Sequence, residues 1–266
     1  MSIEVLAEAP LPESEAHLPP EVSAKLGVSI QVAGLIVRDV RRLYMDRMTR
    51  RFTDLKFKER LKRTNPFLMQ VRGVVTVRQW AENQVNSALF ASEEEAIGHV
   101  LETIAKACHP GGREPTIPDD FDLEVPSQGT ITGYQIKMSW DCMPMSSRKN
   151  LSNTIRKLKE HYAPQGIDFV GVFAPCYGRA ITKKPPGQDY ISMRSRDFWS
   201  EVGSGDGGYD VKVGEVCRLL CSEFRAELAR SAIPTLIDRL VTEGTKVFGD
   251  GEGNIDYGKL FRQVNP

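Results

Sequence analysis

The spacing of apolar residues predicts helices in the first third of the chain. Residues 1–27 are rich in Glu, Ala and Pro, which predicts an irregular N-terminal arm. Between residues 28 and 63 the apolar positions recur at helical spacing; they are Ile30, Val32, Ile36, Val37 and Leu43. Two capping-box patterns follow, Thr76-x-x-Gln79 and Ser92-x-x-Glu95. They predict one helix ending near Ala88 and a second ending near Cys108.

The pattern then changes to one that is typical of strands. Residues 121–125 and 131–138 predict a hairpin across a Pro-Ser-Gln-Gly turn. The nearly continuous apolar run at 167–174 is typical of a central strand covered on both faces. Residues 189–193 give a fourth strand candidate. Helices are predicted at 148–161, 211–230 and 234–248, so the fold class is α/β, a central mixed sheet flanked by helices.

These elements suggest three regions. An irregular arm covers residues 1–27, a helical and basic region covers 28–75, and a core with C-terminal helices covers 76–266. The basic region carries many cations between residues 38 and 63. They form either a solvated helical face or a surface that contacts phosphates.

Composition narrows the class of protein. Lys plus Arg equals Asp plus Glu, at 35 each, so net charge indicates no partner. No apolar run approaches bilayer length and no secretory leader pattern opens the chain, so we expect a cytoplasmic protein without a membrane anchor. The five cysteines include no Cys-x-x-Cys pair, which argues against structural zinc and favours reduced thiols.

The predicted hairpin carries the candidate chemistry. Asp122 lies on its first strand, and Gln135 and Lys137 share a face of the second because they are two residues apart. Acidic or amide oxygens that hold a divalent ion beside a lysine are suited to phosphodiester hydrolysis. A hairpin with a solvated outer face would show the same three residues, so this pattern alone leaves both interpretations open.

A family resemblance decides between them. The segments Asp120-Phe121-Asp122-Leu123-Glu124 and Tyr134-Gln135-Ile136-Lys137 resemble the PD-(D/E)xK nuclease core, and more closely the type II restriction endonucleases of the PmeI/EcoO kind. The similarity runs from about Asn65 to the C-terminus and extends more loosely into the N-terminal helices. Further landmarks follow in the family's order: Asn65-Pro66-Phe67, Glu94 with Gly98, Ser146-Ser147, Val170-Gly171-Val172-Phe173, Phe198-Trp199-Ser200, Asp250-Gly251 and Lys259-Leu260.

The resemblance implies roles for individual residues. Asp122 would be the bridging metal ligand and Lys137 the catalytic lysine, with Mg2+ as cofactor and Mn2+ as a substitute. Gln135 stands where the general pattern has an acid, so another carboxylate is expected to compensate. Glu94 is the first choice and Glu102 the reserve. Asp119 and Asp120 replace Asp122 if the register shifts, and Glu124 could assist.

DNA contacts are expected around the active-site strand. Two groups are proposed, one leading from the strand into the following helix and one in the loop after the central strand. They are Trp140, Ser146, Ser147, Arg148, Lys149 and Asn150, and then Arg179, Lys183 and Lys184. Without the resemblance, the helix residues would equally fit a solvated surface.

The resemblance implies a prokaryotic enzyme that cuts double-stranded DNA at a short palindromic or near-palindromic site. The chain has one Asp122/Lys137 set, so cutting both strands favours a homodimer. Dimer contacts are expected on the N-terminal helix with Ile30, Ile36 and Val37, or on the terminal helices with Leu219, Leu228, Leu236 and Leu240. A structure-specific repair or junction nuclease and an inactive DNA-binding protein remain the alternatives.

Overall fold

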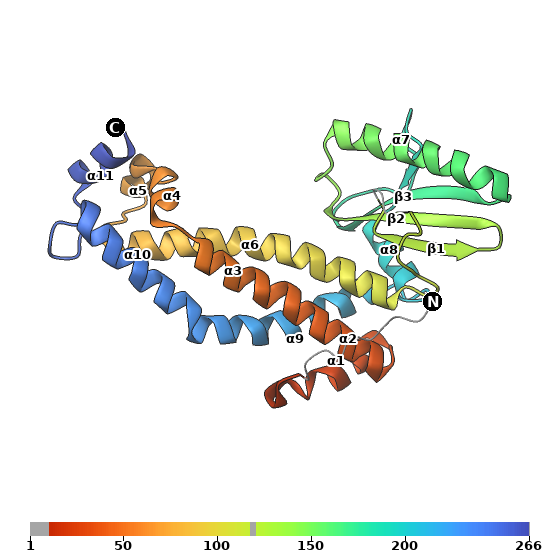
Figure 1. The fold of residues 1–266 in the computed structure, drawn as a ribbon, viewed down its shortest axis with the longest axis horizontal. Coiled ribbons are helices and arrows are strands. Elements are labelled where there is room, and N and C mark those ends of the chain that lie inside the picture. Colours follow the sequence, from red (N-terminus) through yellow and green to blue (C-terminus); the bar gives the residue numbers. More distant parts are fainter. Residues whose placement is uncertain (1–10, 118–120, 266) are drawn as a thin grey trace. The chain divides into compact units, whose positions relative to one another are not determined.

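A computed structural model describes residues 11–117 and 121–265. The chain divides into two compact units. The first comprises residues 1–40 and 98–220, and the second comprises residues 41–97 and 221–266. The first unit holds the sheet and the second is helical (Figure 1).

The sheet of the first unit has four strands in the order β1-β2-β3-β4. The strands are β1 (Leu123–Ser127), β2 (Thr130–Ser139), β3 (Asp168–Tyr177) and β4 (Tyr190–Ser192). β1 pairs with β2 antiparallel, and the other two pairings are parallel. The predicted α/β class with a mixed sheet is therefore confirmed, and the apolar run at 167–174 is an inner strand, as expected.

Helices cover both faces of this sheet (Figure 1). On one face, α7 (Met145–Tyr162) packs Leu151 and Ile155 against Phe169 and Phe173. On the other, α8 (Ser195–Val202) places Phe198 against the Tyr134 ring, and Trp199 donates a 2.9 Å hydrogen bond to the carbonyl of Cys176. α7 approaches β3 closely enough that a Cβ on Gly171 would lie 2.3 Å from Ile155 Cδ1.

The N-terminal region differs from the expected irregular arm. Residues Glu13–Glu15 form a 3-10 turn, and α1 spans Leu18–Leu26. Leu18, Val22 and Leu26 repeat every four residues and are buried, while the prolines occupy the first turn, where a missing N–H costs no helical hydrogen bond. The part of the arm before residue 11 lies outside the described residues.

The helical prediction after residue 28 is confirmed with breaks. α2 spans Ile30–Arg41, a π-helical stretch covers Arg42–Asp46, and α3 (Arg47–Asp54) and α4 (Phe57–Lys62) follow. In the described part of the chain, no single helix is long and apolar enough to cross a membrane, although the bent pair Glu13–Leu26 and Ile30–Asp54 would suffice together by length and composition.

The two helices predicted between residues 76 and 108 are one helix, α6 (Val77–Cys108). The first capping box is real: Gln79 N donates to Thr76 Oγ1 at 3.1 Å, and Thr76 N donates to Gln79 Oε1 at 3.0 Å. The second is not, because Ser92 Oγ instead donates to the carbonyl of Ala88, 2.8 Å away. Ser92 is therefore a buried residue within the helix.

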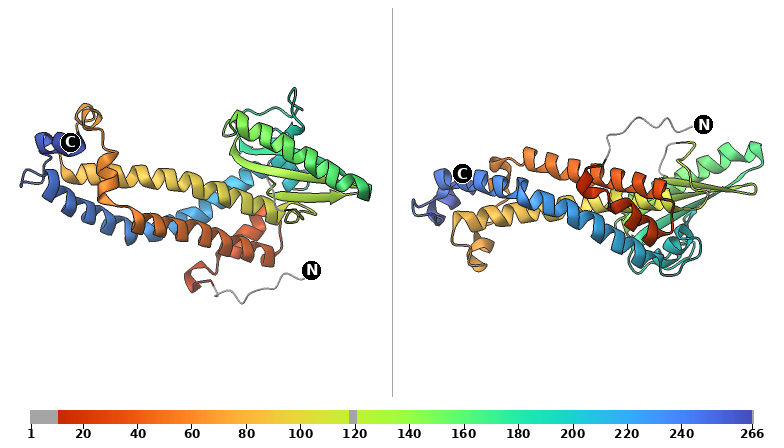
Figure 2. Two further views of the ribbon diagram at one scale, coloured as in Figure 1. Left: turned by 45° about the horizontal axis from the view of Figure 1, so that its top comes forward. Right: turned by 90° about the horizontal axis from the view of Figure 1, so that it is seen from below.

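The second unit packs its helices around an aromatic core. Trp80 contacts both Phe57 and Phe248 edge to face, with ring centroids 5.6 Å and 5.1 Å apart. α3, the first part of α6 and α10 (Ala232–Phe248) run side by side in both views of Figure 2.

Besides α1, the sequence pattern missed three short helices: α5 (Pro66–Val71), α8 and α11 (Tyr257–Val264). Asn65 caps α5, because its side chain accepts from Leu68 N. α9 spans Tyr209–Arg230 as expected, but α10 is followed by α11, so the chain closes on three helices and not two.

Candidate active site

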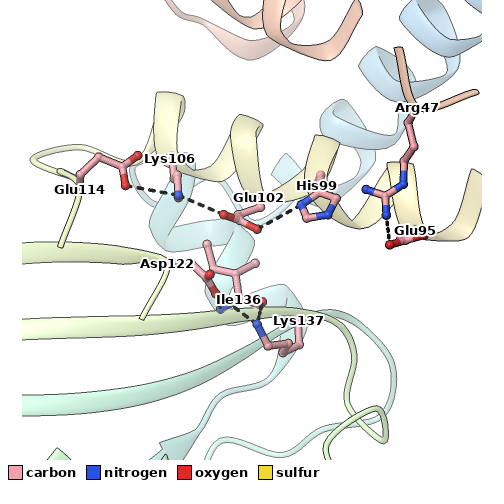
Figure 3. Close-up of polar contacts among 9 residues, drawn as sticks. All are labelled: Arg47, Glu95, His99, Glu102, Lys106, Glu114, Asp122, Ile136 and Lys137. Carbon is pink, nitrogen blue, oxygen red and sulfur yellow. Dashed lines mark hydrogen bonds and ion pairs between the residues drawn. The ribbon is translucent and has the colours of Figure 1, made fainter. Parts of the chain in front are cut away.

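Asp122 lies at the entrance to β1, where the hairpin register brings it beside β2. Leu123 is paired with Tyr134, and Asp122 N donates to the carbonyl of Tyr134 at 2.8 Å. Asp122 Oδ2 accepts from Ile136 N at 2.7 Å and lies 3.4 Å from Lys137 Nζ (Figure 3). The same ammonium donates to the carbonyl of Ile136 at 3.0 Å. The predicted pair of Asp122 and Lys137 is thus in direct contact.

The surroundings of Asp122 penalise its negative charge. Burial raises the pKa of the Asp122 carboxyl above its ordinary value, and Glu102 raises it further. Lys137 and the backbone N–H of Ile136 act in the opposite direction, because both stabilise the carboxylate. A second positive charge close to Asp122 would therefore favour its ionised form.

α6 brings more charge toward the end of the hairpin (Figure 3). Lys106 Nζ lies 3.0 Å from Glu102 and 3.4 Å from Glu114. Although burial acts against it, the pKa of Lys106 is raised, because Glu102, Glu114 and Asp122 all stabilise its positive charge. His99 Nδ1 lies 3.9 Å from Glu102 on the other side. The three carboxylates thus create a place where a cation is favoured.

The compensating acid of the sequence prediction can now be placed. Glu102 acts on Asp122 electrostatically, whereas Glu94 is not among the groups that dominate its ionisation. Glu94 is exposed and lies eight residues earlier on α6, about 12 Å along the helix axis at 1.5 Å per residue. It also belongs to the second compact unit. Glu102 thus lies in the same compact unit as Asp122 and acts on its charge.

Gln135 is buried, with 9% of its surface exposed. Its Oε1 atom has no hydrogen-bond partner among the described residues. Gln135 and Lys137 together line a pocket of about 180 Å³, whose other walls are Cys142, Met143, Pro144, Ser147 and Asn150. A buried acceptor without a partner costs free energy, so an unmatched amide oxygen in a pocket indicates a site for a positively charged or donating group.

Of the remaining acidic candidates, the described residues include Glu124. Glu124 was expected to share the face of Asp122, but it is buried and its carboxylate is hydrogen-bonded to other residues. Its Oε2 accepts from Thr116 N at 3.0 Å, from Thr116 Oγ1 at 3.1 Å and from Arg113 at 3.4 Å. Glu124 therefore holds the segment before β1 in place. Asp119 and Asp120 lie outside the described residues.

The hairpin end carries oxygen donors of the kind that a divalent cation binds. Within residues 11–117 and 121–265, the structure contains no cluster of three His, Cys, Asp or Glu side chains that could hold a metal. Glu102 acts electrostatically on the Asp122 carboxylate, and Gln135 adds an unmatched amide oxygen in the pocket beside Lys137. Oxygen donors of this kind suit a hard cation such as Mg2+ that keeps several waters.

Comparison with known proteins identifies the family. The family model described as Type II restriction endonuclease EcoO109I matches residues 30–216, more than half of the chain. The chain belongs to this family. Among curated proteins, none matches the chain. Membership of a restriction endonuclease family implies a nuclease that acts on DNA, in agreement with the acid and lysine at the hairpin end.

As a restriction endonuclease, the chain must present residues to DNA, and the expected residues differ in their surroundings. Ser147 and Asn150 line the pocket beside Lys137, and Ser146 and Lys149 are exposed. Arg148 is half-buried, because its Nε donates to the carbonyl of Met143 at 3.1 Å. It therefore braces the start of α7, which begins at Met145 without a side-chain cap.

The second predicted DNA-binding group lies in the loop after β3. Arg179, Lys183 and Lys184 are exposed there, and a backbone bridge between Lys183 and Ser192 fixes the loop. Trp140 is exposed at the end of β2. Sequence reasoning missed Lys106 and ranked Glu102 second, although their spacing of four residues places both on one side of a helix.

Proposed function

We propose that the chain is a type II restriction endonuclease that hydrolyses both strands of duplex DNA at a short palindromic or near-palindromic sequence. We propose further that its core is of the PD-(D/E)xK type and similar to that of the PmeI/EcoO enzymes. The observation that carries this proposal is the contact between Asp122 and Lys137 at the hairpin end, with Glu102 close by, in a chain of this family.

The side chains at this end have complementary tasks. Lys137 holds its ammonium beside Asp122, where it can orient the attacking water and stabilise the charge that develops on the phosphate. Asp122, Glu102 and the amide oxygen of Gln135 would hold the divalent ion, Mg2+ or in its place Mn2+. When bound, the ion supplies a polarised water and neutralises phosphate charge.

Digestion of plasmid and phage DNA tests the function. The purified chain should give discrete fragments with Mg2+ and none with a chelator. Cutting that follows DNA structure, with no discrete fragments from linear duplex, would favour a repair or junction nuclease. Binding in a gel shift without cutting in Mg2+ or Mn2+ would favour an inactive DNA-binding protein, an alternative that the neutral Gln135 supports.

Exchanging two glutamates on one helix tests the metal ligands. Glu102→Gln should raise the Mg2+ concentration needed for half-maximal cleavage on the order of tenfold or more, because it removes a charge beside Asp122. Glu94→Gln is the matched control, since it removes the same charge from an exposed position on α6. If Glu94→Gln raises the required Mg2+ concentration more than Glu102→Gln does, Glu94 and not Glu102 is the metal ligand.

Gln135→Glu tests the unmatched amide. If Gln135 is a ligand, the added carboxylate should lower the Mg2+ concentration needed for cleavage, because the site gains a negative charge. Gln128→Glu places the same charge in the exposed hairpin turn and should leave the titration unchanged. An identical metal titration for Gln135→Glu and wild type would show that this side chain does not bind the ion.

We propose a two-fold homodimer as the cutting species, because each subunit has one Asp122/Lys137 set. Of the residues predicted for its interface, Ile36, Val37, Leu228, Leu236 and Leu240 are buried within the chain and serve its own packing. Ile30 on α2 stays half exposed and is available for a dimer contact. Light scattering should give about twice the chain mass without DNA; a monomer both free and bound to DNA would contradict this assembly.

A further inference from the structure

The turn after β2 holds one aromatic side chain in a fixed position. Cys142 closes the turn, with its Sγ donating to the carbonyl of Ser139 at 2.8 Å, and Ser139 Oγ bonds to the carboxylate of Asp141. Trp140 lies between these residues and has 44% of its surface exposed. The backbone that carries this tryptophan is therefore restrained, although its ring is partly in solvent.

The loop after β3 supports the ring from one side. A Cβ placed on Gly178 would lie 2.1 Å from Trp140 Cδ1 and 2.9 Å from Cγ. Gly178 also has a φ of +115°, a conformation that other L-residues rarely adopt. Glycine is needed at this position because the indole lies directly on the backbone of the loop.

The neighbours of this ring are aromatic and cationic. Ser139 is paired with Tyr177, which is also exposed, so two aromatic side chains lie at adjacent strand ends. Arg179 is exposed next to Gly178, and Lys137 precedes Trp140 by three residues, about 10 Å along an extended strand. Aromatic rings beside cations are the usual arrangement for holding nucleic-acid strands, since bases stack while phosphates are neutralised.

We infer that Trp140 stacks on a nucleobase that leaves the duplex stack, in the DNA strand whose phosphate lies at Lys137. The inference rests on the proposed function and adds a base contact to it. A supported aromatic surface with a cationic border suits a flat base joined to a phosphate. An apolar protein partner would leave the charge of Arg179 without compensation.

Tryptophan fluorescence tests the contact in the unmodified protein. Trp80 and Trp199 are buried, so quenching of emission by acrylamide reports on Trp140. The probe is a duplex that carries a mapped cleavage site, added in chelator so that it stays intact. Bound duplex should reduce the acrylamide quenching to the level of free Trp140→Phe protein, and unchanged quenching in a bound complex would overturn the inference.

Matched variants separate stacking from other contacts. Trp140→Leu should weaken duplex binding by roughly 5- to 150-fold, the range for loss of one stacked base, while Trp140→Phe should stay near wild type. Unchanged emission of the buried tryptophans confirms folding of both variants. If the Leu and Phe variants bind the duplex equally well, stacking by Trp140 is contradicted. Cleavage in Mg2+ would in that case still support the nuclease function. If the wild-type chain neither binds nor cuts duplex DNA, both proposals fail.

Discussion

Replacing Lys137 by Ala is expected to lower the rate of DNA cleavage by about 10²- to 10³-fold, the loss typical of removing one group that stabilises transition-state charge. The ammonium lies 3.4 Å from Asp122 Oδ2. Single-turnover cleavage at saturating Mg2+ measures the effect, because it separates chemistry from product release.

Two further variants define what the lysine contributes. Lys159→Ala removes an equal charge from an exposed position on α7 and should cut at the wild-type rate. Lys137→Arg keeps the charge but replaces a compact ammonium by a planar guanidinium, so it should recover only part of the activity. Binding of duplex in chelator should weaken modestly in Lys137→Ala, because one cation at the phosphate is lost. Full cleavage by that variant would remove Lys137 from the chemistry.

The sequence predicted the sheet well because its strands have distinct patterns. The apolar run at 167–174 is typical of a covered strand, and the Gly129 turn lies between two apolar runs of the right length. The pattern failed where helix signals are ambiguous. Ser92 and Glu95 have the spacing of a cap, but the hydroxyl of Ser92 bonds within the helix instead, so one long helix replaced two. The pattern also missed α1, which buries Leu18, Val22 and Leu26. The neighbouring prolines suggested an irregular segment, but the first turn of a helix accepts proline.

The chemistry of the site was partly predictable for a related reason. Asp122 and Lys137 are joined by hairpin register, which depends on residues close in sequence. Both candidates for the compensating acid lie on α6, and which of them approaches Asp122 depends on the rotation and length of that helix. The sequence pattern split this helix at Ser92, and Glu94 was ranked before Glu102. The continuous helix brings Glu102 and Lys106 toward Asp122 instead.

Asp122→Asn should abolish cleavage while it preserves the fold. The amide oxygen can still accept from Ile136 N, so the hairpin end keeps its hydrogen bond. Loss of the carboxylate removes both a metal ligand and the partner of Lys137, and cleavage should fall by at least the factor expected for Lys137→Ala. Duplex binding in chelator should become tighter than in wild type, because one charge that repels phosphates is gone.

The pH dependence of stability gives this variant a second readout. Burial raises the pKa of Asp122 in the folded chain, so the folded state holds this proton more firmly than the unfolded state. Its contribution to stability is therefore present at acid pH and is lost as the pH rises through the raised pKa. An asparagine side chain cannot ionise, so Asp122→Asn does not lose this stability as the pH rises. In denaturant unfolding, the free energy of unfolding of the variant should exceed that of wild type at neutral pH. In acid the two proteins should be equally stable. A variant that is less stable than wild type at neutral pH would show that the contact with Lys137 outweighs burial in the metal-free protein.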